Sequence, residues 1–248
     1  MSEVVVNASV TLDGVMQAPA GPDEDTRGGF EHGGWARPYF DQVMAEQAGE
    51  GIAKGGAFLF GRRTYEHFAS VWPHQPDDDM FAKVLNERTK YVASRSLREP
   101  FEWRNSTLLK GDAADAVAEL KRQEDKDLVI LGSGELIRSL MAHDLIDEYR
   151  LLIHPLVLGS GRRLFTDGTF ATLRLVDSTR TTTGVVIATY RPAEPKASTT
   201  TSASQLVTVS PVVHVSVPRP PSSVSVPSPP SSVSSPATPE IVSVPGPP

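Results

Sequence analysis

Cysteine is absent from the sequence, and this excludes disulfide bonds, thiolate-bound metal sites and a cysteine nucleophile. An excess of basic residues is also lacking, because 24 Lys and Arg stand against 30 Asp and Glu, for a formal net charge of -6 at pH 7. Proteins that bind nucleic acid or anionic membranes usually present a basic surface, so we expect neither partner. A small-molecule partner is expected instead, and any redox chemistry must come from a cofactor.

Long apolar runs are missing too, since none approaches the roughly 20 residues of a membrane-spanning helix. The first residues, MSEVVVNASVTLDG, have neither the basic start nor the unbroken apolar stretch of a secretory signal. We therefore expect a cytoplasmic protein. The chain has 248 residues, 39% of them hydrophobic, which is enough for one sizeable core but little for two full domains.

Aromatic residues do not occur after Tyr190, and the composition changes near the same point. From Glu194 onward the chain has 13 of its 21 prolines and only four charged residues, and the short motifs PPSSVS and VSVP recur. Such a segment has too little apolar content to form a core. We expect one domain over residues 1–193 and a disordered tail rich in Pro, Ser, Val and Thr over residues 194–248. A linker or dispensable tail is favoured over a peptide ligand or a glycosylated stalk.

Apolar strand-like runs alternate with amphipathic stretches between residues 3 and 191, a pattern typical of α/β proteins with a largely parallel sheet. The last strands follow one another without a helix, which predicts an antiparallel edge. Strands are expected at 4–9, 57–60, 91–93, 107–109, 128–131, 149–153, 173–176 and 185–190. Helices are expected at 35–54, 62–70 and 79–86, after a cap at Asp112, and around 136–141.

Three of the expected strands are followed by loops suited to a phosphorylated ligand. The loop at 61–64 combines a glycine, two arginines and the start of a helix, and the loop at 94–96 adds another arginine. The loop at 132–134 is rich in glycine and also precedes a helix, although it lacks the third glycine of the Rossmann fingerprint. Each loop alone is compatible with an ordinary turn. Ligands of open α/β sheets bind at the carboxyl ends of strands, so together the loops predict a nucleotide site.

A resemblance to the dihydrofolate-reductase-like family, which includes the RibD C-terminal reductase domain of riboflavin biosynthesis, covers nearly all of residues 3–192. It is carried, in order and spacing, by VVVNASVTLDGV, GGWARPYF, LFGRRTYE, YVASRSL, VILGSGELIRSLM and DEYRLLIHPLVLGSGRRLF. The resemblance implies a three-layer α/β fold with a mixed, mostly parallel central sheet flanked by helices, a homodimer, and NADPH bound across the strand ends. The cofactor-binding residues that it implies are Gly61, Arg62, Arg63, Thr64, Ser94, Arg95, Gly132, Ser133, Gly134, Glu135 and Leu136.

The LDG turn after the first strand borders the nicotinamide and the substrate in the riboflavin reductases, which makes Asp13 the candidate proton donor or substrate anchor. An Asp-Gly pair also forms turns by itself, so a purely structural role is an equal alternative. Dihydrofolate reductases carry an acidic residue on the helix after the tryptophan loop, where this chain has Phe40 with Asp41 beside it. Folate is therefore not expected as the substrate. Bacterial riboflavin reductases are usually fused to a zinc deaminase domain, which we do not expect here because cysteine is absent and few residues precede residue 3.

The resemblance implies NADPH-dependent hydride transfer to a C=N or C=O bond of a small heterocyclic or ribosylamino-pyrimidine-like substrate, as in 5-amino-6-(5-phosphoribosylamino)uracil reductases. Two alternatives stay open, namely a non-catalytic nucleotide or pterin binder on the same fold and a detoxifying reductase with a loose pocket. The six histidines lack helical metal-site spacing, so no metal is expected. Trp35, Trp72 and Trp103 are expected in the core or a pocket wall. Gly159 and Gly161 are expected in a hairpin, with a position facing the site as the alternative.

Overall fold

The computed structural model describes residues 2–76 and 78–193. Its strands are β1 (Val4–Thr11), β2 (Ala57–Gly61), β3 (Lys90–Ala93), β4 (Ser106–Leu109), β5 (Leu128–Leu131), β6 (Glu148–His154), β7 (Leu173–Arg180) and β8 (Val186–Pro192). Its α-helices are α1 (Gln42–Lys54), α2 (Arg62–Val71), α3 (Met80–Glu87), α4 (Ala113–Gln123) and α5 (Gly134–Met141). Short 3-10 helices span Arg37–Tyr39 and Trp72–His74. The expected tail at 194–248 lies outside the described residues.

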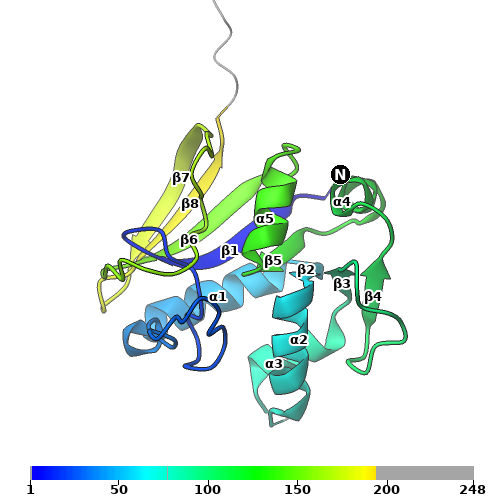
Figure 1. Cartoon of the computed structure of the whole chain (residues 1–248), viewed down its shortest axis with the longest axis horizontal. Helices are drawn as coiled ribbons and strands as arrows, with labels where there is room; N and C mark the ends of the chain where they lie inside the picture. Colours follow the sequence, from blue (N-terminus) through cyan, green and yellow to red (C-terminus); the bar gives the residue numbers. More distant parts are fainter. Residues whose placement is uncertain (1, 77, 194–248) are drawn as a thin grey trace, which may run out of the picture. The chain divides into compact units, whose positions relative to one another are not determined.

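All the described strands form one sheet in the order β4-β3-β2-β5-β1-β6-β8-β7 (Figure 1). The strands from β4 to β6 in this order pair in parallel, whereas β8 pairs antiparallel with both β6 and β7. This confirms the mixed, mostly parallel sheet and its antiparallel edge. Because β5 inserts between β2 and β1, the carboxyl ends of these three strands lie side by side.

Helices cover both faces of the sheet, because side chains alternate along each strand. One face presents the alternating residues of β1 together with Leu59 and Ile130, which pack against α4 and α5 in the main core. In Figure 1, α5 crosses β1 and β5 on the face toward the viewer. The other face presents Phe58 and Phe60, which pack with Trp103 and with residues of α2 and α3. The result is the three-layer arrangement that the resemblance implies.

Aspartate side chains determine where two of the helices begin. The carboxylate of Asp112 accepts hydrogen bonds from the backbone N–H groups of Ala114 at 2.8 Å and Asp115 at 3.4 Å, which confirms the expected cap of α4. Asp79 caps α3 in the same way. Such caps satisfy N–H groups that have no partner within the helix.

The expected helix over 35–54 is wrong at its start, because α1 begins only at Gln42. The preceding Phe40 is extended, at φ -67° and ψ 129°, and 65% exposed, so it does not share a buried helix face with Met44. The physical reason is Asp41, whose carboxylate accepts the N–H of Met44 at 2.9 Å and so caps the helix at this point. Trp35 and Trp103 are buried as expected.

The hairpin expected around Gly159 and Gly161 is also wrong, because the antiparallel hairpin of the structure joins β7 to β8. The segment at 158–165 instead runs alongside the chain that follows β1, where Val15 and Arg163 form an isolated bridge. A Cβ added to Gly161 would lie 2.7 Å from the Phe30 ring and 2.8 Å from the Val15 side chain. This glycine therefore permits a close approach between segments rather than a tight turn. In the described part of the chain, no helix has the length and apolar character needed to cross a membrane.

Candidate functional site at the carboxyl ends of the strands

The structure brings the three predicted loops to one edge of the sheet. Gly61 ends β2 and pairs with Ala93 of β3, so the loop that begins at Ser94 starts beside it. On its other side, the backbone N–H of Gly61 donates a hydrogen bond to Ser133 Oγ at 2.9 Å. A Cβ built on Gly132 would lie 3.9 Å from the methyl group of Thr64. The loops after β2 and β5 are therefore in direct contact.

The two helices at this edge begin without side-chain caps. No side-chain hydrogen bond caps α2 at Gly61 or α5 at Ser133 within the described residues. Gly132 and Ser133 both have positive φ, 67° and 63°, which turns the chain sharply from β5 into α5. By contrast, α3 and α4 have aspartate caps. Free N–H groups at a helix N-terminus bind anions, so these two helix starts are suited to phosphate.

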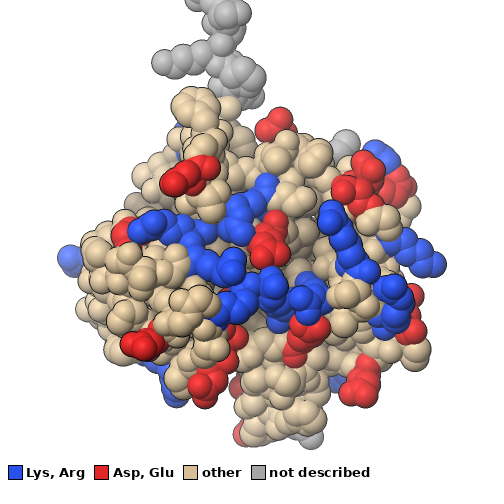
Figure 2. Space-filling model, viewed as in Figure 1, with Lys and Arg blue, Asp and Glu red and all other residues tan. Residues whose placement is uncertain are grey.

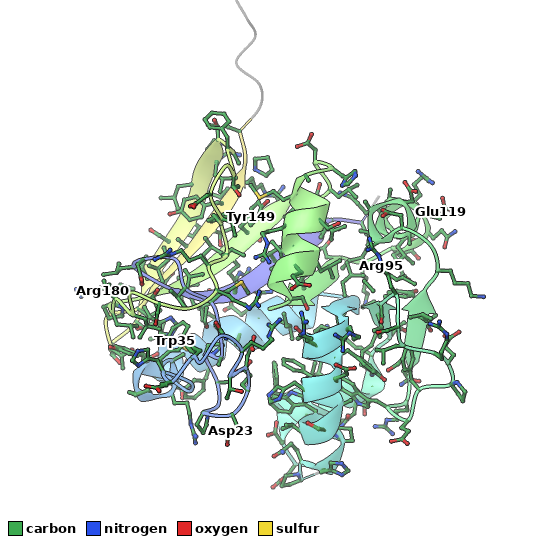
Figure 3. The ribbon with its side chains drawn as sticks, viewed as in Figure 1. Asp23, Trp35, Arg95, Glu119, Tyr149 and Arg180 are labelled. Carbon is green, nitrogen blue, oxygen red and sulfur yellow. The ribbon has the colours of Figure 1, made fainter. Side chains whose placement is uncertain are left out.

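Arginine and lysine side chains gather in a band across this face, over the starts of α2 and α5 (Figure 2). Of the predicted arginines, Arg63 pairs with Glu135 across the two loops at 3.0 Å, whereas Arg62 pairs with Glu66 of its own helix at 3.0 Å. Figure 3 shows the side chain of Arg95 extending from the loop after β3. The predicted Leu136 is buried in the main core beneath the site. The band gives a protein of negative net charge a local site for an anion.

Sequence reasoning missed further arginines at this edge. The guanidinium of Arg27 lies 3.9 Å from the Glu135 carboxylate. Arg138 of α5 donates to the carbonyl oxygen of Arg163 at 3.2 Å, and Arg163 Nε donates to the carbonyl oxygen of Asp13 at 2.9 Å. Arg138 belongs to α5, but Arg27 and Arg163 lie in segments that are distant from the three loops in sequence and reach them only through tertiary packing. The GRR motif at 161–163 was the available signal, since it repeats the glycine-arginine pattern of the first loop.

Asp13 uses its carboxylate to hold a neighbouring loop. Its oxygens accept the hydroxyl of Thr11 at 2.5 Å and the backbone N–H groups of Leu158 at 3.2 Å and Gly159 at 2.9 Å. The hydrogen bond from Thr11 is the main cause that lowers the pKa of Asp13 below its usual 3.8, and the two backbone N–H groups add to it. The side chain is therefore an anion at neutral pH. Asp13 also sits in a turn, because the N–H of Gly14 donates to the Thr11 carbonyl oxygen.

Asp41, beside Phe40, is occupied by a structural contact. Its carboxylate accepts the backbone N–H and the hydroxyl of Thr182, both at 2.6 Å, and the N–H of Thr183 at 3.3 Å. The hydroxyl contact is the largest of the causes that lower the pKa of Asp41. This residue fastens the start of α1 to the turn between β7 and β8. It is thus not placed to protonate a substrate.

The segment of residues 17–36, which we call the glycine-rich segment, lies beside this edge and carries Trp35 (Figure 3). The indole N–H of Trp35 donates to the carbonyl oxygen of Gln17 at 2.7 Å, and its ring meets the ring of His154 edge-on at 5.1 Å. His154 Nδ1 lies 2.9 Å from the Leu152 carbonyl oxygen, so Nδ1 carries the proton. Burial lowers the pKa of His154 and keeps the ring neutral. The His154 side chain that packs against Trp35 is therefore uncharged.

Cavities elsewhere in the described residues do not share this chemistry. One of about 600 Å³ lies between α3 and the segments around Pro73 and Trp103, and another of about 410 Å³ lies near Gly55, before β2 begins. Neither contains the start of a helix or converging arginines. In the part of the chain described, no group of three or more His, Asp or Glu side chains gathers as a metal site would require. The strand ends therefore remain the strongest candidate site.

Comparison with protein families and with known sequences gives one family match and two relatives. The family model of the RibD C-terminal domain matches residues 2–187. The uncharacterized protein YyaP of Bacillus subtilis is 27% identical over 195 residues, which is 75% of this chain and 93% of that protein. YwjB of the same organism is 34% identical over 107 residues, covering 43% of this chain and 56% of YwjB.

Solved structures share the fold at low identity. A protein from Shewanella sp. PV-4 that is assigned to riboflavin biosynthesis superposes with a TM-score of 0.58 and 20% identity, over 78% of this chain and 99% of that one. A pyrimidine reductase-like protein from Corynebacterium diphtheriae superposes with a TM-score of 0.56 and 13% identity, over 78% of this chain and 93% of that one. RibD of Acinetobacter baumannii superposes with a TM-score of 0.53 and 15% identity, over 78% of this chain and 59% of RibD.

Proposed function

This chain belongs to the RibD C-terminal domain family, and from that premise we propose that it is an NADPH-dependent reductase of a small heterocyclic substrate. The observation that carries the proposal is the contact between the loops after β2 and β5, which sets two helix N-termini without side-chain caps at one edge. Two such N-termini beside arginine side chains favour a ligand with a diphosphate group. A dinucleotide coenzyme has this group, and its chemistry suits the family.

In this proposal, the coenzyme phosphates are held by the backbone N–H groups at the starts of α2 and α5, while Ser94 and Arg95 contact the adenosine side. Arg62 and Arg63 favour NADPH over NADH, because each charge-assisted hydrogen bond to the 2′-phosphate contributes roughly 1.5 to 3 kcal/mol. When bound, NADPH supplies a hydride. The residues of this chain supply position and electrostatics.

We place the substrate between Asp13 and the glycine-rich segment. The lowered pKa of Asp13 keeps its carboxylate ionised, so it is suited to anchor an N–H or O–H group of the substrate and poorly suited to donate a proton at neutral pH. Hydride transfer to a C=N or C=O bond then takes its proton from water. Arg163, which contacts Asp13, and Arg138, which contacts Arg163, favour a substrate with an anionic group, such as a ribosylamino-pyrimidine phosphate.

Titration of the protein with NADPH and NADH, followed by nicotinamide fluorescence, tests the coenzyme. We expect the Kd for NADPH to be at least about tenfold lower than for NADH, and Arg63→Ala to remove most of this difference. Arg62→Ala is measured alongside. Arg122→Ala is the matched control, because Arg122 lies on α4 and pairs with Glu119 of the same helix. Equal affinities for the two coenzymes would remove the argument for phosphate selection.

Turnover separates a reductase from a binder on the same fold. Oxidation of NADPH is followed by absorbance with pyrimidine, pterin and sugar-amine substrates. A single preferred substrate supports the proposed function, and a broad profile favours a detoxifying reductase. Tight NADPH binding without oxidation of any substrate would favour the non-catalytic alternative.

We also propose that the protein is a homodimer and acts in the cytoplasm. The homodimer is expected from the family resemblance, and a 26.8 kDa chain would then have about twice that mass in solution. Light scattering during gel filtration measures this directly. A mass equal to one chain at micromolar concentration would refute the dimer and leave the coenzyme site unaffected.

A further inference from the structure

The carboxylate of Glu135 lies between two arginines from different parts of the chain. It accepts a hydrogen bond from Arg63 at 3.0 Å and lies 3.9 Å from the guanidinium of Arg27. The Glu135 side chain is 66% exposed, so it can move away from this position without disrupting the core. Its Cα belongs to the first turn of α5, where the free N–H groups of the helix begin. A carboxylate thus stands where an anionic ligand would find the most positive surroundings.

Arg27 is held in the glycine-rich segment by several hydrogen bonds. Its side chain forms two hydrogen bonds with Asp25, one of them from Nε at 2.6 Å. The side-chain amide of Gln17 donates to the carbonyl oxygens of Asp25 at 3.0 Å and Arg27 at 2.9 Å, while the carbonyl oxygen of Gln17 accepts from Trp35. This network orients Arg27 without using all of its donors.

One nitrogen of Arg27, Nη1, is left without an acceptor. It is enclosed and has no hydrogen-bond partner among residues 2–76 and 78–193, and it is the nitrogen that faces Glu135. A buried guanidinium N–H without an acceptor costs free energy, so a ligand oxygen placed there would be bound favourably. A phosphate offers more acceptor oxygens than the carboxylate, so it can accept from both Arg27 and the helix N–H groups.

We propose that Glu135 occupies the position of the ligand phosphate in the free protein and that Arg27 is a phosphate-binding residue of the site. The inference rests on the proposed function and extends it. Binding of the coenzyme displaces the Glu135 carboxylate, a phosphate of its diphosphate group then lies between Arg27 and the start of α5, and Arg63 is released to contact the 2′-phosphate. Because Arg27 is hydrogen-bonded to Gln17, which in turn accepts from Trp35, the phosphate ties the glycine-rich segment to the coenzyme loop. Coenzyme binding therefore orders the glycine-rich segment, beside which we place the substrate.

Two variants and a matched control test this inference. Glu135→Gln removes the competing charge, and Arg27→Met removes the phosphate donor but keeps an unbranched side chain. Glu119→Gln is the control, because Glu119 pairs with Arg122 within α4 and has no role in the proposed site. We expect Glu135→Gln to lower the Kd for NADPH about two- to fivefold. Arg27→Met should raise it at least about tenfold, and the control should leave it unchanged.

Inorganic pyrophosphate serves as a second probe, since it tests phosphate recognition without the nicotinamide. In calorimetric titrations with pyrophosphate we expect Glu135→Gln to bind more tightly than the wild type and Arg27→Met to bind more weakly. A Glu135→Gln variant that binds either probe more weakly would mean that the carboxylate contacts the ligand, and the displacement would be overturned. An unchanged Kd in Arg27→Met would overturn the role of Arg27.

Hydrogen exchange of the ligand-free protein tests the contact itself and does not depend on coenzyme binding. Peptides from residues 20–34 should exchange faster in Glu135→Gln and Arg27→Met than in the wild type and in Glu119→Gln. Equal rates in all four proteins would overturn the inference even where NADPH binds normally. A wild type that binds pyrophosphate but not NADPH would overturn the proposed function alone, while a wild type that binds neither probe would overturn both.

Discussion

Replacing Asp13 with asparagine distinguishes a loop-holding anion from a proton donor. The carboxylate accepts the N–H groups of Leu158 and Gly159 and the hydroxyl of Thr11. Asparagine keeps one oxygen acceptor but places an NH₂ group against another donor. Losing charge-assisted hydrogen bonds of this kind costs about 2 kcal/mol of the free energy of unfolding. For a domain of this size, that corresponds to a fall in Tm of about 4–8 °C.

The pH dependence of this loss has a definite sign. The pKa of Asp13 is lower in the folded state than its usual 3.8, so its stabilising contribution is full above pH 4 and is lost as the pH falls through the folded pKa. The difference in Tm between the wild type and Asp13→Asn should therefore be constant from about pH 5 to 8 and become smaller below about pH 4. Thermal unfolding followed by circular dichroism measures both quantities.

The kcat and KM of Asp13→Asn separate loss of a proton donor from loss of a substrate anchor. Loss of a general acid lowers kcat by roughly 10² to 10⁴, whereas loss of a substrate anchor raises KM and leaves the pH profile of kcat unchanged. Asp177→Asn is the matched control, because Asp177 is an exposed aspartate on the edge strand β7. If Asp13→Asn unfolded at the wild-type temperature at pH 7, the hydrogen bonds of this carboxylate would not support the loop, and the reasoning would be refuted.

Other predictions concern single residues of the fold. Asp41→Ala should speed hydrogen exchange at the start of α1 and in the turn at 181–184 while the Kd for NADPH stays unchanged, since Asp41 joins these two segments. Gly161→Ala should lower the free energy of unfolding, measured in urea, by about 2 kcal/mol or more, because the new Cβ would lie 2.7 Å from the Phe30 ring. Gly168 also has a positive φ but faces open space, so Gly168→Ala should lower it by only about 1 kcal/mol. Burial lowers the pKa of Lys90 to about 8, so the folded protein holds this side chain neutral at pH 9.5 while the unfolded chain protonates it. The free energy of unfolding in urea should therefore be about 2 kcal/mol higher at pH 9.5 than at pH 7, and Lys90→Met should abolish this difference.

Much of the fold was predictable because local sequence and burial agree. The run Leu128–Leu131 is a strand with the predicted bounds, since four consecutive apolar residues suit a parallel strand that is covered on both faces. The cap at Asp112 follows from a side-chain contact only two to three residues away. Contacts of this range are visible in sequence because they depend on spacing alone.

The errors arose where distant segments decide the local structure. The start of α1 depends on Asp41, whose other partners are Thr182 and Thr183, more than 140 residues away. Gly161 adapts to Val15 and Phe30, and no local pattern distinguishes this from a hairpin glycine. At the site, the strand-end rule predicted the meeting of the loops after β2 and β5. It gave no indication of Arg27, because that side chain reaches the edge from an irregular segment.

The strand order ties the site to the completion of folding. The hydrogen bond from Gly61 to Ser133 joins residues 72 positions apart in the chain, and it exists only after β5 has inserted between β2 and β1. In a nascent or partly unfolded chain that lacks this central strand, the start of α5 is not placed beside Gly61. Any ligand that binds here therefore selects molecules whose sheet is fully assembled, and by mass action it protects that central strand against opening.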